Sequence, residues 1–285
     1  MTEIIQRKLN DSAFVRWTAL ILIALTMFFG YMFVDMMSPL QSMIEAQRGW
    51  TPDVFGMYGS SEFIFNVFGF LILAGIILDK MGIRFTGVLS ASLMFIGASI
   101  KYYGVSDAFI GSGIETWLNS WWVSFPGSAK LASLGFMIFG CGMEMAGITV
   151  SKAIAKWFEG KEMALAMGLE MAIARVGVFA VFTISPWLAN MAPATVVRPV
   201  AFCTLLLLIG LLTLLAFHAV EERKDWHPLI RTILLALVVA AGMGLALWMK
   251  TDYDAKGVMC ILLLYVFRKK RSIQILAGCL FFSWW

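Results

Sequence analysis

The chain has 285 residues, of which 60% are hydrophobic and only 14% are charged, and its formal net charge is +4. Soluble domains carry roughly one-quarter charged residues, so this composition excludes disorder and argues against an ordinary soluble enzyme. The basic residues are distributed according to the membrane topology described below, so nucleic acid is not an expected partner.

Long apolar runs follow one another along the chain, each near the ~20 residues that a helix needs to cross a bilayer. Six strong runs predict spans at 17–37, 54–78, 85–104, 132–157, 163–188 and 199–219. Weaker candidates follow at 230–249, 253–267 and 272–285. We therefore expect an all-α, multi-pass integral membrane protein whose outer surface contacts lipid.

The distribution of lysine and arginine predicts the orientation of these spans. With the amino terminus in the cytoplasm, 15 of the 22 basic residues lie on the inner side and one, Arg175, lies within a span. The others lie on the outer side: Arg48, Lys101, Lys130, Arg198, Lys250 and Lys256. The amino terminus is therefore expected inside. The short amino-terminal tail has no acidic dileucine-type signal, which favours a bacterial cytoplasmic membrane.

Neither a metal site nor a cofactor site is expected, and the chain is not predicted to be an enzyme. The cysteines stand alone in apolar runs, without the CxxC spacing of a metal or redox site: Cys141, Cys203, Cys260 and Cys279. The two histidines flank one membrane boundary. The predicted spans contain no HExxH motif, no serine–histidine pair and no carboxylate dyad with catalytic spacing.

The turn between the second and third predicted spans is very short and combines glycines with charges: Gly75, Asp79, Lys80, Gly82 and Arg84. Glycine permits the tight bend, and the charges hold it at the interface. These residues resemble the signature G-x-x-x-D-(R/K)-x-G-(R/K)-(R/K) of the major facilitator superfamily, with Ile83 departing at one basic position. The resemblance implies a conformational latch, in which Asp79 holds the cytoplasmic end of the second half in the outward-facing state. A merely charged inner loop is the alternative.

A second signature lies on the fourth and fifth predicted spans. It reads F-G-x-G-x-E at 139–144, W-F-x-G-K-E at 157–162, G-L at 168–169 and A-R-x-G at 174–177. Together with Asp35, Leu40 and Gln41 at the ending of the first span, it resembles the superfamily branch that contains lysosomal dipeptide transporters and their bacterial relatives. The resemblance covers about residues 15–190. It implies the six-helix amino-terminal half of a major facilitator fold and transport by alternating access.

Two opposite charges are predicted at similar depth in the membrane. Glu144 lies 13 residues before Trp157, about 20 Å along a helix, and Arg175 lies 12 residues after Met163, about 18 Å along the returning helix. Each costs roughly 2.5–3.5 kcal/mol in the middle of a bilayer. They are therefore expected to face one another or an aqueous cavity.

Three interpretations of this pair remain open. In the first, Arg175 grips the carboxylate of a zwitterionic solute through its planar fork while Glu144 accepts the α-ammonium, the roles that the resemblance also implies. In the second, the chain carries organic anions: Arg175 binds a carboxylate and Glu144 couples protons. In the third, the two residues form a structural bridge between helices in a non-transporting membrane protein or subunit.

Other ionisable groups in or beside the spans complete the candidate substrate-binding set: Asp35, Glu62 and Glu170. Glu62 is predicted in the outer half of its span. Glu170 lies about 140° around the helix from Arg175, so these two are not expected to share a face. Small residues of the fourth span are predicted to serve close helix packing: Gly135, Gly140, Gly142, Ala146 and Gly147.

The predicted domain organisation is a six-helix bundle at 1–220, a charged cytoplasmic connector at 221–231 and an incomplete second half at 232–285. That second part would hold two or three further, truncated helices. Superfamily members rock two halves about a central site. We therefore expect that transport needs a second half-transporter chain, self-association or the remainder of the reading frame.

Overall fold

The computed structural model describes residues 13–222. They belong to the first of two compact units into which the chain divides, Met1–Asp225 and Trp226–Trp285. The three weaker predicted spans and the predicted second half at 232–285 lie outside the described residues, as does most of the predicted connector.

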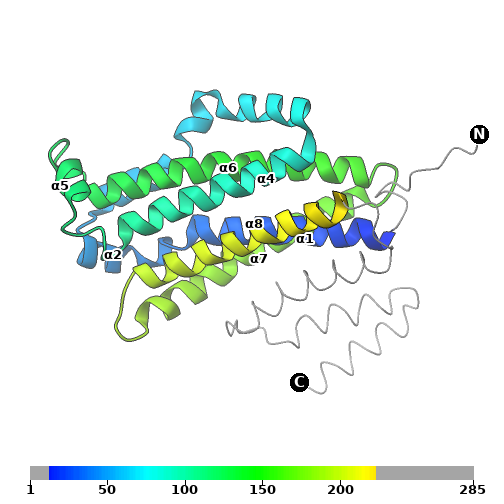
Figure 1. The fold of residues 1–285 in the computed structure, drawn as a ribbon. Coiled ribbons are helices and arrows are strands. Elements are labelled where there is room, and N and C mark those ends of the chain that lie inside the picture. Colours follow the sequence, from blue (N-terminus) through cyan, green and yellow to red (C-terminus); the bar gives the residue numbers. More distant parts are fainter. Residues whose placement is uncertain (1–12, 223–285) are drawn as a thin grey trace, which may run out of the picture. The chain divides into compact units, whose positions relative to one another are not determined.

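All regular elements of the described part are helices (Figure 1). In chain order they are α1 (Ala13–Asp35), η2 (Ser38–Leu40), α2 (Gln41–Arg48), α3 (Pro52–Ser61), η3 (Asn66–Phe70), α4 (Leu71–Val105), α5 (Gly113–Asn119), α6 (Gly127–Trp157), α7 (Met163–Asn190) and α8 (Val197–Glu222). Five stretches of this part are long and apolar enough to cross a membrane. The prediction of an all-α membrane protein is therefore confirmed.

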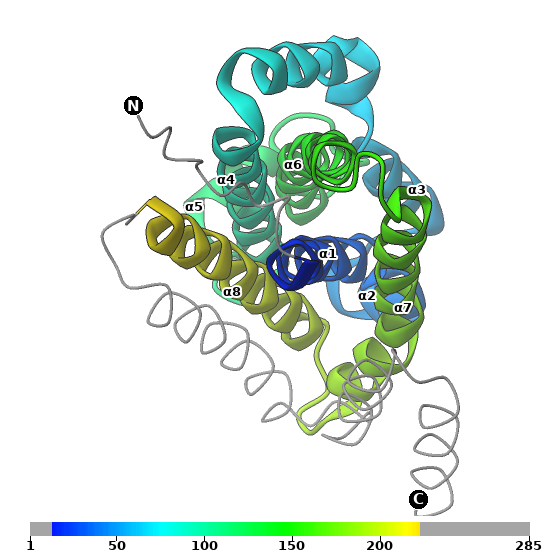
Figure 2. The same ribbon diagram turned by 90° about the vertical axis from the view of Figure 1, so that its right-hand side faces the viewer.

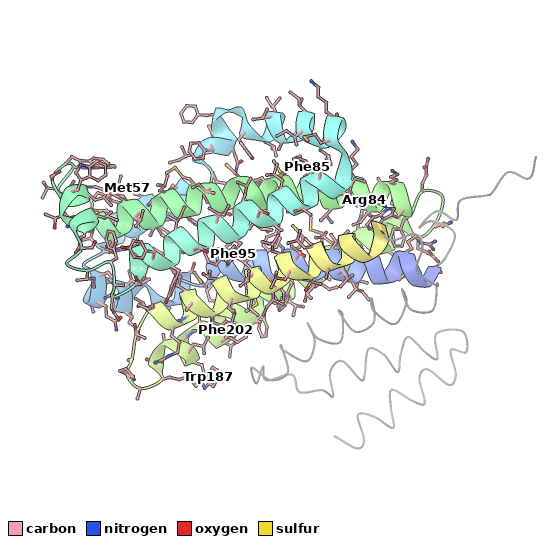
Figure 3. The ribbon with its side chains drawn as sticks, in the orientation of Figure 1. Met57, Arg84, Phe85, Phe95, Trp187 and Phe202 are labelled. Atoms are coloured by element: carbon pink, nitrogen blue, oxygen red, sulfur yellow. The ribbon has the colours of Figure 1, made fainter. Side chains whose placement is uncertain are left out.

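One of those five stretches, Pro52–Val105, contains both the second and the third predicted spans. Gly82 divides it, because its φ of +82° and ψ of 171° are not helical. The chain reverses there, and the Thr86 hydroxyl donates to the Gly82 carbonyl at 2.8 Å. Arg84 lies beside this reversal, toward the opposite end of the bundle from Met57 of α3 (Figure 3). The short turn expected at this position is therefore present.

The second predicted span, 54–78, is not one continuous helix, which corrects the prediction. Helix α3 ends at Ser61, and the π-helical η3 contains Gly69 at φ +99°, a left-handed conformation that breaks a regular ladder. Glu62 sits at the start of this break with only 6% of its surface exposed, whereas Phe68 is 85% exposed. The break thus turns a carboxylate inward and an apolar segment outward.

Figure 2 shows α1 between α4, α6, α7 and α8. Helix α4 packs mainly against α6 and α1 mainly against α7. The α4–α6 contact needs glycine, since a Cβ on Gly135 would lie 2.5 Å from the Gly97 carbonyl oxygen, and one on Gly142 would lie 2.7 Å from the Met94 nitrogen. Close packing is thus confirmed for Gly135 and Gly142. The prediction of close packing is wrong for Gly147, which has open space beside it.

Candidate functional site

A cavity of about 350 Å³ lies between four helices of the bundle. Its lining comes from α1, α4, α6 and α7: Met27, Tyr31, Leu71, Glu144, Gly147, Ile148, Ser151, Glu170 and Met171. Two of these residues are carboxylates. Glu144 is partly exposed and Glu170 is buried. The cavity therefore offers acceptors for a cation inside an otherwise largely apolar wall.

Helical periodicity explains how α6 builds its share of this wall. The α6 residues on the cavity are Glu144 and those three, four and seven positions later: Gly147, Ile148 and Ser151. Such spacing places side chains on one face of a helix. The glycine in this stripe leaves space, and the serine adds a hydroxyl. In α1 the spacing of four between Met27 and Tyr31 does the same.

Arg175 contacts an aromatic ring that lines the cavity. Its guanidinium carbon lies 5.4 Å from the centre of the Tyr31 ring, and Tyr31 is itself part of the lining. On α7, Arg175 lies four residues after the lining residue Met171, which places the two on nearly the same face. Its side chain is exposed rather than sealed among other residues. The cation therefore lies beside one lining residue of the cavity, Tyr31.

Glu144 and Arg175 do not form an ion pair within 4 Å: the ion pairs given for residues 13–222 join other side chains. The interpretation in which they serve only as a bridge between helices therefore lacks its central contact. Glu144 instead faces the cavity, which is the second of the two arrangements expected from the sequence, an ion pair or exposure to a cavity. Binding of a substrate by either residue stays a prediction.

Glu170 is closer to the cavity than the sequence indicated. It was expected on a different face from Arg175, and indeed only Glu170 of the two contributes to the lining. What sequence reasoning missed is that Glu170 shares the cavity with Glu144. No signal in the sequence indicates this, because it depends on how α6 and α7 are rotated about their axes.

Asp35 and Glu62 lie outside the lining but within electrostatic range of it. The charge of Arg175 acts on Asp35, and the charge of Glu144 acts on Glu62. Asp35 is the last residue of α1, one turn beyond Tyr31. The structure therefore brings Asp35, Glu62, Glu144 and Arg175 into one group of interacting charges. The sequence indicated each of these residues but not that all four interact.

Lys101, which the sequence assigns to the outer side of the membrane, is a further member of this group. It sits in α4 with none of its surface exposed, and its charge acts on both Asp35 and Glu62. Lys101 falls close to the end of an apolar run, where a lysine usually reaches the interface. Aromatic rings from α1, α3 and α6 surround its ammonium instead.

The latch motif surrounds the reversal of the chain at Gly82. The Asp79 carboxylate accepts from the Lys152 ammonium of α6 at 2.5 Å, and the two side chains are 78% and 42% exposed. Gly75 and Lys80 lie before the turn and Arg84 after it. In the described residues Asp79 thus pairs within its own bundle. Its proposed partner in a second half lies outside these residues, so the latch stays a prediction.

Comparison with known proteins gives two related similarities. The chain is 30% identical over 117 residues to the lysosomal dipeptide transporter MFSD1 of Mus musculus. The aligned residues make up 41% of this chain and 21% of that protein. It is 27% identical over 122 residues to the lysosomal dipeptide transporter MFSD1 of Bos taurus, covering 42% and 22%. The match therefore spans about a fifth of the length of these curated relatives. No family model and no solved structure matches the chain.

Proposed function

We propose that this chain forms the substrate-binding half of a membrane transporter that moves small zwitterionic solutes, dipeptides first among them, by alternating access. The observation that carries the proposal is the cavity in which Glu144 and Glu170 face open space beside Tyr31 and Arg175. The partial similarity to dipeptide transporters of mouse and cow supports the same class of solute.

The chemistry of the cavity fits a zwitterion in two parts. The carboxylates of Glu144 and Glu170 would accept the α-ammonium, and charge-assisted hydrogen bonds of this kind are about twice as strong as neutral ones. The Arg175 guanidinium would bind the solute carboxylate with two parallel N–H donors, which the point charge of a lysine cannot reproduce. Asp35 and Glu62 would set the electrostatic potential around both contacts.

An organic anion without an ammonium group is the second candidate solute. Two carboxylates on the same cavity wall repel an anion, and only Arg175 would attract it. Under this alternative Glu144 would carry a coupling proton instead of contacting the solute. Blocking the amine of the solute separates the two candidates, because only the zwitterion interpretation requires that amine.

The setting of this function follows the same proposal. The protein would span a bacterial cytoplasmic membrane with its amino terminus inside. Alternating access needs two halves, so the second would come from the residues after 222, from a partner chain or from self-association. The turn with Asp79 and Gly82 would then act as the latch between halves. No cofactor and no metal enter this mechanism.

Binding to the purified full chain tests the proposal without requiring transport. We expect dialanine to bind in detergent micelles, and N-acetyl-dialanine to bind at least tenfold more weakly because its amine is blocked. Glu144→Gln should weaken dialanine to a similar degree, and Arg175→Lys should too because the fork is lost. Glu45→Gln, an exposed carboxylate of α2, is the matched control and should bind like the parent chain.

A charge exchange distinguishes binding from structural support. Glu144→Arg combined with Arg175→Glu should fold but should not bind dialanine, since both charges then face the wrong end of the solute. If acetylation of the amine leaves the affinity unchanged, the role of Glu144 is wrong. Equal affinity of all variants would overturn the proposed site altogether.

A further inference from the structure

Lys101 is a buried cation that the proposed function does not use. Its side chain is fully buried within α4, and its ammonium nitrogen has no hydrogen-bond partner among residues 13–222. Buried ammonium groups normally find acceptors, because the cost of leaving them unpaired is high. A lysine kept in this state calls for a physical reason.

Aromatic rings surround the ammonium where acceptors are missing. The Lys101 nitrogen lies 4.3 Å from the centre of the Phe33 ring, 4.3 Å from that of Phe136 and 5.1 Å from that of Tyr58. These rings come from α1, α6 and α3, so a cage from three helices encloses the end of a side chain from a fourth. The ring faces attract a cation but cannot take its proton.

The charges nearest the cage are carboxylates. The charges of Glu62, at the break after α3, and of Asp35, at the end of α1, both act on Lys101. Among residues 13–222, two further titratable groups lie near the ammonium, the Tyr58 phenol of the cage and the Cys203 thiol of α8. The hydroxyl of Tyr58, like the Lys101 nitrogen, is buried without a hydrogen-bond partner. Among residues 13–222 no carboxylate lies within 4 Å of the ammonium, so Lys101 and Glu62 interact through their charges and not through a direct ion pair.

The wider group carries an unbalanced charge. Glu144 of α6 acts on Glu62, and Arg175 of α7 acts on Asp35. If all are ionised, three carboxylates face two cations, and the group holds one negative charge in excess. In a medium of low dielectric constant such an excess is unfavourable, and one added proton removes it.

We propose that Lys101 and Glu62 form a proton-binding site inside the bundle, separate from the cavity, that holds one exchangeable proton. The proton comes from water and returns to it, and only an N–H or O–H bond is made or broken. A lysine suits this role because, unlike arginine, it can lose its proton when buried. Since the charge of Glu144 acts on Glu62 and a Coulomb interaction is mutual, the proton at this site changes the potential in the cavity that Glu144 lines.

Nuclear magnetic resonance of the full chain tests this site directly, with no solute present. The lysines are labelled with carbon-13 at the ε position and titrated in detergent micelles between pH 5 and 10. Lys101→Arg identifies the Lys101 signal by removing it. In Glu62→Gln the titration midpoint of that signal should move by one pH unit or more, a tenfold change in proton affinity, because the neighbouring carboxylate is gone. In Glu45→Gln it should not move.

The outcomes are decisive whether or not Lys101→Arg folds. If it does not fold, comparison of the parent chain with Glu62→Gln still identifies any lysine whose midpoint depends on Glu62. A Lys101 signal that titrates together with the surface lysines, or that is unchanged by Glu62→Gln, overturns the proposal. The same holds if no lysine responds. Because these experiments contain no dipeptide, they can fail while the proposed transport function stands.

Discussion

Two faces of α6 show how one helix builds both a packed and an open region. One face carries Gly135 and Gly142, which bring α4 so close that a single added carbon would meet its backbone. The other face carries Glu144 and Gly147 and borders the cavity. Glycine thus permits close packing of two helices on the first face and leaves empty space on the second. Whether a glycine does one or the other depends on whether the backbone of another helix lies opposite it.

The same contrast separates the charges of the two regions. Near the packed face, Lys101 lies among aromatic rings with no exposed surface. At the open face, Glu144 borders space that a solute can enter. The bundle thus holds charges in two environments, a closed one among aromatic rings and an open one beside a cavity. Substitutions on the two faces of α6 should affect the protein differently, the first its folding and the second its binding of solute.

The largest effect is expected from Gly135→Leu on the packed face. Its side chain would clash with the backbone of α4, since a Cβ alone would already lie 2.5 Å from the backbone nitrogen of Lys101 and 2.5 Å from the carbonyl oxygen of Gly97. Overpacking typically costs about 1–3 kcal/mol, and more where backbone must move. We expect loss of the folded, monodisperse protein in size-exclusion chromatography. Normal folding of this variant would show that α4 and α6 are not in this close contact.

Gly147→Leu is the matched change on the open face. Nothing lies within 4 Å of the position that its Cβ would occupy, so folding should be retained. The leucine would extend into the cavity of about 350 Å³ and compete with a solute for that space. We expect dialanine affinity to fall more than tenfold, with a thermal unfolding midpoint close to that of the parent chain. Unchanged affinity would mean that this cavity is not the binding site.

Most of the fold was predictable because it depends on the length of apolar runs. Each of the six strong runs ends within a few residues of the end of an observed helix or of the turn at Gly82. The break between Glu62 and Gly69 was not predictable, since hydropathy stays high across it. Only the carbonyl of Glu62 approaching Gly140, a tertiary contact, indicates why the chain departs from a straight helix there.

The candidate site was predictable residue by residue but not in its grouping. A charge inside an apolar run marks Glu62, Glu144, Glu170 and Arg175, because such charges are costly in lipid. Their neighbours depend on the rotation of each helix and on which helices touch. The burial of Lys101 was not predictable for this reason, because the aromatic cage around it comes from three other helices.

Tyr31→Leu should have a smaller effect, confined to the open face. The variant removes the ring beneath the Arg175 guanidinium, a contact with 5.4 Å between guanidinium carbon and ring centre. Cation–π contacts of this kind contribute about 0.5–2 kcal/mol. We therefore expect dialanine affinity to fall about fivefold, measured by titration calorimetry. Tyr31→Phe keeps the ring and should bind as the parent chain does, whereas equal losses in both variants would assign the effect to the hydroxyl.

The smallest effect is expected at the end of α6, where Lys152 pairs with Asp79 at the surface. Both side chains are substantially exposed, so water and salt screen the attraction, and such pairs contribute about 0–1 kcal/mol. Asp79→Asn should shift the thermal unfolding midpoint by no more than about 3 °C. High salt should reduce even this shift, because screening weakens the pair in the parent chain. A loss comparable to that of Gly135→Leu would mean that the Asp79–Lys152 pair holds the bundle together, which its exposure argues against, and would leave no separate role for Asp79 as a latch between two halves.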